Sequence, residues 1–203
     1  RRDFIRSAFA AAGAAAAVPG VLAASNPVPP SGGDANILDL PEHSKGLGQP
    51  VAFALEGVEG VAYFSPRGGR LAREALLKRL SEAQREVLVA AFVLTDREVL
   101  EALLQARRRG AEVKVLLETR NLGTSREEAL LEEGLEVRQD ANPYTMHHKV
   151  MLLDGTYVVT GSYNFSVRAH EVNNENLLVL KSPSLAERYR KEVLRLWEAG
   201  SPL

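Results

Sequence analysis

The chain has 203 residues, of which 45% are hydrophobic and 25% charged, so it has the composition of a folded protein with room for one domain and a tail. Lysine and arginine total 25 against 26 acidic residues, and the formal net charge of −1 excludes a protein that holds nucleic acid by bulk positive charge. The lack of cysteine in this chain excludes disulfides, thiolate metal sites and cysteine nucleophiles.

The first 23 residues have the three parts of an export signal. Arg1 and Arg2 stand near Phe4, and an uncharged, alanine-rich stretch from 7 to 24 ends in small residues. The paired arginines resemble a twin-arginine signal. The alternative, an alanine-rich surface helix, would be interrupted by Gly13 and Pro19. We therefore expect an exported protein, periplasmic or secreted. We expect no stable membrane anchor, because about 18 alanine-rich residues lie at the lower limit for a span.

A linker and a single domain are expected to follow the signal. Residues 24–50 contain five prolines and a Ser-Gly-Gly run, which is typical of a linker. From residue 51 onward, strand and helix patterns alternate. Strands are predicted at 51–55, 61–64, 86–93, 112–118, 149–153, 156–160 and 176–180, and helices at 71–83, 95–110, 125–133 and from 182 onward. The predicted catalytic domain thus covers 51–203.

These alternating elements predict an α/β fold, with a mixed central β-sheet flanked by helices on both faces. The run 86–93 is apolar without alternation, as expected of a central strand buried on both faces. Asp154 and Gly155 separate two strand patterns and predict a hairpin with a type I′ turn, which makes the sheet mixed. A capping box from Thr95 to Glu98 is expected to begin the second helix.

One segment brings together side chains that suit chemistry on a phosphate. His147 and Lys149 are two residues apart on a predicted strand, so their side chains leave the same face. The next strand ends at Gly161 and delivers Ser162 and Asn164 beside them. We expect a helix to begin at Ser162 and to add free backbone N–H groups. The segment predicts a phosphate site, and because it lacks a carboxylate cluster, we expect neither a metal nor another cofactor.

Written as a pattern, this segment reads H-x-K-x4-D-x6-G-S-x-N, and it resembles the HKD motif of the phospholipase D superfamily at every fixed position. Six fixed residue types at fixed gaps would match by chance about once in 10⁸ starting positions. The similarity extends over roughly residues 60–200, including the segments 64–66, 107–110 and 174–176. Over that range the chain resembles the small, exported bacterial endonucleases of this superfamily, which carry one motif per chain. The resemblance implies their α-β-α sandwich.

The resemblance also implies roles for individual residues. His147 would be the nucleophile that forms a phosphohistidine. Lys149 and Asn164 would hold the non-bridging phosphate oxygens, with Ser162 hydrogen-bonding at the same site. Glu175 would accept a hydrogen bond from His147 and fix its tautomer.

Asp154 belongs to the motif and to the expected catalytic set, although its place at the hairpin turn favours a structural role. Family members use two motifs per active site, the second histidine acting as general acid, and this chain has one motif. The only other H-x-K begins at His43 and lacks the later aspartate and Gly-Ser, so we interpret it as a coincidence in the linker. The resemblance therefore implies a homodimer with its active site at the two-fold interface.

The remaining polar and aromatic candidates are expected to be structural. His148 should point away from the site, His170 should be a surface residue, the run 107–109 should form a solvated helix end, and Trp197 should pack in the core.

The sequence leaves three functions to compare. The first is a metal-independent phosphodiesterase that cleaves DNA or RNA as a non-specific endonuclease. The second is a phospholipase D that hydrolyses phosphatidylcholine-type lipids to phosphatidate. The third, a binding protein without activity, is disfavoured because every position of the motif is intact.

Overall fold

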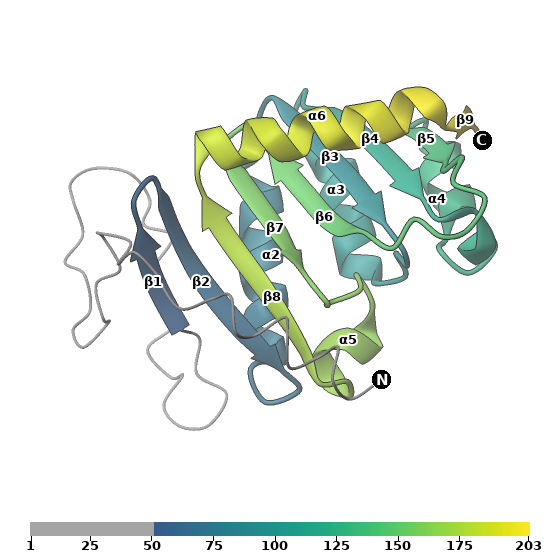
Figure 1. The fold of residues 1–203 in the computed structure, drawn as a ribbon. Helices are drawn as coiled ribbons and strands as arrows, with labels where there is room; N and C mark the ends of the chain where they lie inside the picture. The colour runs from purple at the N-terminus through teal and green to yellow at the C-terminus, as the bar shows by residue number, and fades with distance from the viewer. Residues whose placement is uncertain (1–50) are drawn as a thin grey trace, which may run out of the picture.

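The computed structural model describes residues 51–203, drawn in colour in Figure 1. The predicted export signal, the linker and His43 lie outside the described residues. The strands are β1 (Val51–Leu55), β2 (Val58–Ser65), β3 (Glu86–Ala91), β4 (Glu112–Leu117), β5 (Glu136–Gln139), β6 (Lys149–Leu153), β7 (Tyr157–Gly161), β8 (Glu175–Lys181) and β9 (Ser201–Pro202). The helices are α2 (Gly69–Glu82), α3 (Arg97–Arg108), the 3₁₀ turn η1 (Thr119–Asn121), α4 (Glu127–Glu132), α5 (Val167–Glu171) and α6 (Pro183–Ala199).

Within residues 51–203 the strands form one sheet in the order β1-β2-β8-β7-β6-β3-β4-β5-β9. β3, β4 and β5 are parallel, and the other pairs are antiparallel. Helices α2 and α3 lie on one face, and α6 crosses the other (Figure 1). This arrangement confirms the predicted mixed α/β fold with helices on both faces.

Strand β3 occupies the middle of the sheet, as its uninterrupted apolar sequence predicted. Val87, Val89 and Ala91 join the core beneath α2 and α3, whereas Leu88 and Ala90 join the core beneath α6. Burying a Val or Leu side chain completely stabilises the fold by about 1.5–3 kcal/mol, so this strand is a major contributor to stability.

The hairpin between β6 and β7 has the predicted type I′ turn, with positive φ values of 54° at Asp154 and 64° at Gly155. The Asp154 carboxylate accepts hydrogen bonds from the backbone N–H groups of Gln84, Arg85 and Glu86 at 2.8–3.3 Å. The turn is thereby fastened to the residues that lead into β3, which explains a structural need for aspartate here.

The expected capping box at Thr95 is wrong by one residue. Asp96 is the N-cap of α3, and its carboxylate accepts a hydrogen bond from Glu98 N at 3.0 Å. Asp96 is fully buried and also receives two hydrogen bonds from Arg73, both 2.7 Å long. These bonds place the cap at Asp96.

The expected helix at Ser162 is also wrong. The segment after β7 is irregular, and α5 begins only at Val167, with Ser166 as its N-cap. Phe165 is fully buried and exchanges backbone hydrogen bonds with the segment 93–96, which holds this stretch extended instead of helical. α5 is therefore the predicted helix with a later start, whereas the short strands β5 and β9 were not predicted from the sequence.

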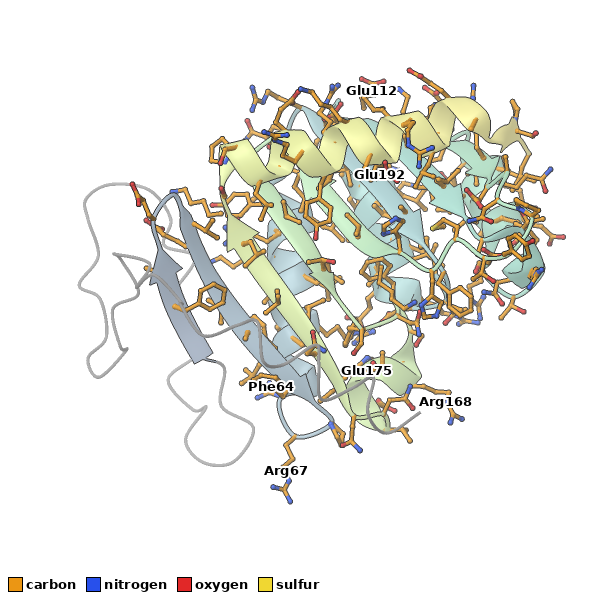
Figure 2. All side chains as sticks on the ribbon, in the orientation of Figure 1. Phe64, Arg67, Glu112, Arg168, Glu175 and Glu192 are labelled. Atoms are coloured by element: carbon orange, nitrogen blue, oxygen red, sulfur yellow. The ribbon has the colours of Figure 1, made fainter. Side chains whose placement is uncertain are left out.

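At one end of the sheet, strands β2, β3 and β7 finish and strands β6 and β8 begin. The register there pairs Ala91 with Lys149, Gly161 with Leu177 and Ser65 with Glu175. We call this end, which carries these six residues, the motif end. Figure 2 labels four residues at the motif end, which are Phe64, Arg67, Arg168 and Glu175. No helix within residues 51–203 is both long enough and apolar enough to cross a membrane.

Candidate active site

His147 and Lys149 lie together at the motif end. His147 directly precedes β6 and is exposed, whereas Lys149 is the first residue of β6 and only 5% exposed. Lys149 Nζ donates a hydrogen bond to the backbone carbonyl of His147 at 2.8 Å. Among the described residues no other hydrogen bond or ion pair of this ammonium is present, so two of its three N–H groups remain unused. Burial lowers the pKa of Lys149, and the charge of Glu175 partly opposes that shift.

Ser162 and Glu175 form the second part of the site. The Ser162 hydroxyl donates to Glu175 Oε2 at 2.5 Å, and it accepts from Asn176 N at 3.1 Å. The other carboxylate oxygen, Oε1, accepts from Asn173 Nδ2 at 3.1 Å. Gly161 has a φ of 147°, and a Cβ at this position would lie 2.2 Å from Asn176 O. Glycine is therefore required before Ser162 for β7 to run this close to β8.

Asn164 is half-buried on the same loop, and its neighbours in the sequence, Tyr163 and Phe165, are buried. Its side-chain Oδ1 is buried and has no hydrogen-bond partner. Leaving a buried acceptor unpaired costs about 1–3 kcal/mol, so this oxygen does not contribute to the stability of the fold. Of the predicted set, His147, Lys149, Ser162, Asn164 and Glu175 are all carried by segments at the motif end.

Phe92 is a member of the site that the sequence did not reveal. Its ring lies edge-on to the imidazole of His147, with centroids 4.4 Å apart and an interplanar angle of 61°. Lys149 Nζ lies 4.5 Å from the centre of the same ring. A single aromatic residue after a buried strand is an ordinary core pattern, so nothing in the sequence distinguished it.

Glu118 was also missed. It follows β4, is 1% exposed, and accepts hydrogen bonds from the backbone N–H groups of Arg120 and Met146. Since Met146 directly precedes His147, this buried carboxylate fixes the segment that presents the imidazole.

Asp154 lies at the opposite end of β6, about 16 Å from the motif end for a five-residue strand. It is therefore excluded from the group around His147, which corrects its inclusion in the catalytic set and supports the structural interpretation. The expected hydrogen bond from His147 to Glu175 is not present within residues 51–203, where the carboxylate is bonded to Ser162 and Asn173. A helix beginning at Ser162 does not contribute N–H groups, because α5 begins later.

The two other histidines in the described part of the chain, His148 and His170, differ in their surroundings. His148 is half-buried and alternates with Val150 and Leu152, which pack in the core beneath α6, so it lies on the face opposite His147 and Lys149, as expected. His170 is 7% exposed, which overturns the expectation of a surface residue. Its Nδ1 has no hydrogen-bond partner and lies 3.8 Å from Asp96 Oδ2, in a buried cluster with Arg73 and Tyr163. Burial raises the pKa of Tyr163, and the nearby Asp96 charge adds to the shift.

The arginines at the end of α3 lie away from the site and make structural contacts with neighbouring segments. Arg107 donates to Glu133 O, Arg108 pairs with Glu133 at 3.0 Å, and Arg109 donates to Leu80 O at 2.6 Å. They belong to the opposite end of the sheet, where β4 begins.

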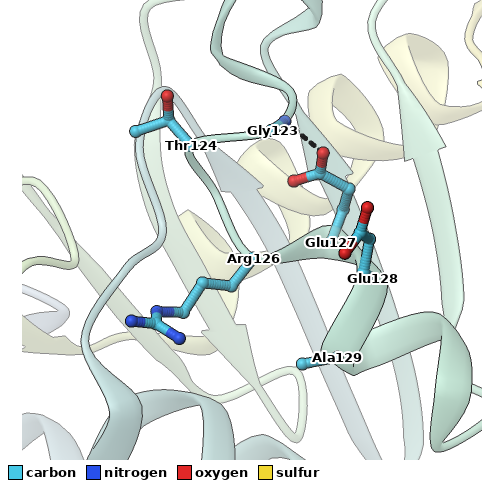
Figure 3. Close-up of a pocket in the computed structure, with 6 residues that line it drawn as sticks. All are labelled: Gly123, Thr124, Arg126, Glu127, Glu128 and Ala129. Carbon is cyan, nitrogen blue, oxygen red and sulfur yellow. Dashed lines mark hydrogen bonds between the residues drawn. The ribbon is translucent and has the colours of Figure 1, made fainter.

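A hollow of about 390 Å³ lies outside this group, between the loop after η1 and the start of α4 (Figure 3). Its lining includes Gly123, Arg126 and Glu127, and Glu127 accepts a hydrogen bond from Gly123 N within it. None of the motif residues lines it, so it is separate from the candidate site. Among residues 51–203 no group of three or more His, Asp or Glu side chains is placed to hold a metal ion.

The motif end of this mixed α/β sheet thus carries a histidine, a buried lysine, a serine and an asparagine. Residues 76–197 match the family model described as "Cardiolipin synthase, PLD-like domain". The chain belongs to this family.

Several known proteins are similar to the chain. It is 36% identical over 129 residues to a mitochondrial cardiolipin hydrolase of Xenopus laevis, covering 63% of this chain and 61% of that protein. It is 33% identical over 128 residues to a phospholipase D of Rickettsia typhi, covering 62% of each chain. The match thus spans about three fifths of the length of these relatives. Among solved structures, the phospholipase D family member Nuc of Salmonella typhimurium is 30% identical with a TM-score of 0.67, covering 72% of this chain and 98% of that one.

Proposed function

We propose that this protein is a metal-independent phosphodiesterase that cleaves its substrate through a phosphohistidine on His147. The observation that carries the proposal is the Lys149 ammonium, which is 5% exposed, uses one N–H group, and lies beside an exposed imidazole. A buried ammonium is costly unless it is paired, and a phosphate oxygen is the partner that fits two free N–H groups at this position.

In the proposed first step, a ring nitrogen of His147 attacks phosphorus, and the P–O bond to the leaving group breaks. Lys149 and Asn164 hold the non-bridging oxygens, where negative charge builds up in the transition state. Water then attacks the phosphohistidine, releasing the second product and restoring the imidazole. Ser162 and Glu175 join the ends of β7 and β8 beside the phosphate, and the Glu175 charge helps to keep Lys149 protonated.

The leaving oxygen needs a proton, and the proposed donor is the His147 of a second chain. This second imidazole is then neutral, and it takes the proton that the attacking water loses in the second step. A homodimer with its active site at the two-fold interface supplies both groups, because each protomer presents the same residues. The exposure of His147 supports this arrangement, since an imidazole at the surface is accessible to the same surface of another copy.

Nucleic acid is the proposed substrate, cleaved as DNA or RNA with little sequence preference. Exposed Arg67 and Arg168 at the motif end support it, because arginine side chains near a cleavage site pair with backbone phosphates (Figure 2). Phospholipid is the second candidate, favoured by relatives named cardiolipin hydrolase and phospholipase D. We further propose that the protein is exported and acts in the periplasm or outside the cell.

The test is to incubate the purified protein with plasmid DNA, with RNA, and with vesicles of phosphatidylcholine or cardiolipin, using His147→Asn as the control. Cleavage of plasmid or RNA by the wild type alone supports the nuclease. Release of phosphatidate with intact nucleic acid would transfer the proposal to the lipid substrate, and a wild type that leaves all substrates intact would overturn the phosphodiesterase.

A further inference from the structure

The ring of Phe92 contacts both side chains on which the proposed reaction depends. It meets the His147 imidazole edge-on at 4.4 Å between centroids and lies 4.5 Å from Lys149 Nζ. The carbonyl of His147 accepts a hydrogen bond from that same Nζ at 2.8 Å. Phe92 is therefore the side chain that contacts both His147 and Lys149, while Lys149 is bonded to the backbone of His147.

The backbone of Phe92 is held on both sides. Its N–H donates to His148 O at 2.8 Å, which continues the pairing of β3 with β6 one residue beyond Ala91. Its carbonyl accepts from Asn121 Nδ2 at 2.7 Å, a bond from the turn that follows β4. The ring position is thus set by two neighbouring strands of the sheet.

We infer that Phe92 is a positioning residue, whose ring orients the His147 imidazole for attack and stabilises the Lys149 ammonium beside it. The inference rests on the proposed function for the reaction, but the contacts themselves do not depend on the substrate. An aromatic face attracts an ammonium, most strongly where water is excluded, and Lys149 is almost completely buried. An edge-on ring contact also favours one orientation of the imidazole over its alternatives.

The charged and titratable groups around this ammonium are few in the described part of the chain. Glu175 on β8 acts on it by charge, and His147 precedes it on the same segment. Glu175 and His147 stay unchanged in the Phe92 variants, so the contact between the Phe92 ring and the ammonium is the one that changes.

The test compares Phe92→Leu, which removes the ring, with Phe92→Tyr, which keeps it. Phe53→Leu is the matched control, because Phe53 on β1 packs against the core under α6 and is remote from the motif end. Three kinds of measurement are made, namely the steady-state kinetics (kcat and KM) on the cleaved substrate, the NMR titration of the Lys149 side chain, and the chemical shifts of the His147 ring. Signals are assigned by comparison with Lys149→Arg and His147→Asn.

We expect Phe92→Leu to lower kcat by about tenfold to a hundredfold with little change in KM, as a small misplacement of reacting groups does. The Lys149 pKa should fall by about 0.4 to 1.5 units, the equivalent of one cation–π contact. The His147 ring signals should move as the ring-current field is lost. Phe92→Tyr should keep the wild-type kinetics, Lys149 titration and His147 chemical shifts, because it keeps the ring. Phe53→Leu should also leave all of these unchanged.

A Phe92→Leu variant that keeps kcat and the Lys149 titration of the wild type would overturn the inference. If the variant does not fold, Phe92→Met provides a second replacement without a ring, judged by the same readouts. A wild type that cleaves no phosphodiester while Phe92→Leu still moves the Lys149 pKa and the His147 signals would support the positioning role and refute only the proposed function.

Discussion

The hydroxyl of Ser162 donates to Oε2 of Glu175 at 2.5 Å, a bond that joins the end of β7 to the beginning of β8. The other carboxylate oxygen is held by Asn173 at 3.1 Å, and Asn173 O in turn accepts from the Ser65 hydroxyl at 3.0 Å. The negative charge of Glu175 is therefore fixed in place, and it acts on the buried Lys149 ammonium by raising its pKa. Because both oxygens have defined partners, its expected role is to orient Ser162 and to support the charge on Lys149.

Replacing Glu175 with glutamine tests that role. The amide has one acceptor oxygen in place of two and no charge, so either Ser162 or Asn173 loses its partner. We expect a loss in kcat of about 10²-fold, of the order of one oriented polar group at a reacting phosphate. The Lys149 pKa should also fall further, since the Glu175 charge raises it. Steady-state kinetics and an NMR titration measure both, with the exposed Glu198→Gln on α6 as the control.

His147→Asn should abolish turnover without unfolding the protein, because the imidazole is exposed and its loss leaves no cavity. The reaction then lacks both the attacking nitrogen and the proposed general acid. The control is His148→Asn, the neighbouring residue that faces α6. A reduction in kcat/KM smaller than about a hundredfold, the low end for one acid–base group, would contradict the assignment.

Lys149 predicts a particular pH dependence. Burial lowers its pKa below the ordinary value of 10.5, so the ammonium required for phosphate binding is lost at a lower pH than for an exposed lysine. Activity should therefore fall on the alkaline side before the ordinary lysine range, as a pH profile of kcat/KM would show.

The same shift has a consequence for stability. Between the lowered pKa and 10.5 the unfolded chain binds more protons than the folded one, so stability rises with pH in that window. Lys149→Met should be more stable than the wild type at neutral pH, and the difference should shrink as the pH approaches 10.5. Urea unfolding at several pH values measures it, and a wild type whose stability does not rise relative to Lys149→Met there would refute the prediction.

Asp154→Ala should destabilise the fold by about 1–3 kcal/mol, because three backbone N–H groups before β3 lose a charged acceptor. Asp154→Asn keeps one acceptor oxygen and tolerates the positive φ, so its loss should be smaller. Denaturant unfolding measures the free energy. Since Asp154 lies at the far end of β6, the folded fraction of both variants should keep the wild-type kcat, and a specific loss of kcat would return Asp154 to the catalytic group.

The sequence predicted those parts of the fold in which local pattern and packing agree. The apolar run of β3 and the Asp-Gly turn after β6 carry their own signals and were placed correctly. The segment after β7 was not, because its structure depends on Phe165 pairing with residues 93–96, a contact between distant parts of the chain.

The site shows the same difference between contacts within one segment and contacts between distant segments. His147 and Lys149 are two apart on one strand, and their proximity follows from local geometry. Phe92 reaches them through the pairing of β3 with β6. His170 is on α5, which packs so closely against α2 that a Cβ added at Gly69 would lie 1.9 Å from His170 O. Such contacts depend on the order of the strands and on the packing of the helices. They cannot be predicted from the spacing of residues within one segment.

The last prediction concerns the dependence of activity on assembly. If each active site needs His147 from two chains, a dimer of one wild-type chain and one His147→Asn chain has either the nucleophile or the general acid but never both. Titrating wild type with His147→Asn under exchange should then lower activity as the square of the wild-type fraction, so that an equal mixture keeps about one quarter and not one half. Dilution should likewise remove activity in proportion to the dimer concentration, measured by sedimentation at the assay concentration. A linear dependence on the wild-type fraction, with a fully active monomer, would show that one motif suffices, and the proton donor would have to be sought in His148, His170 or His43.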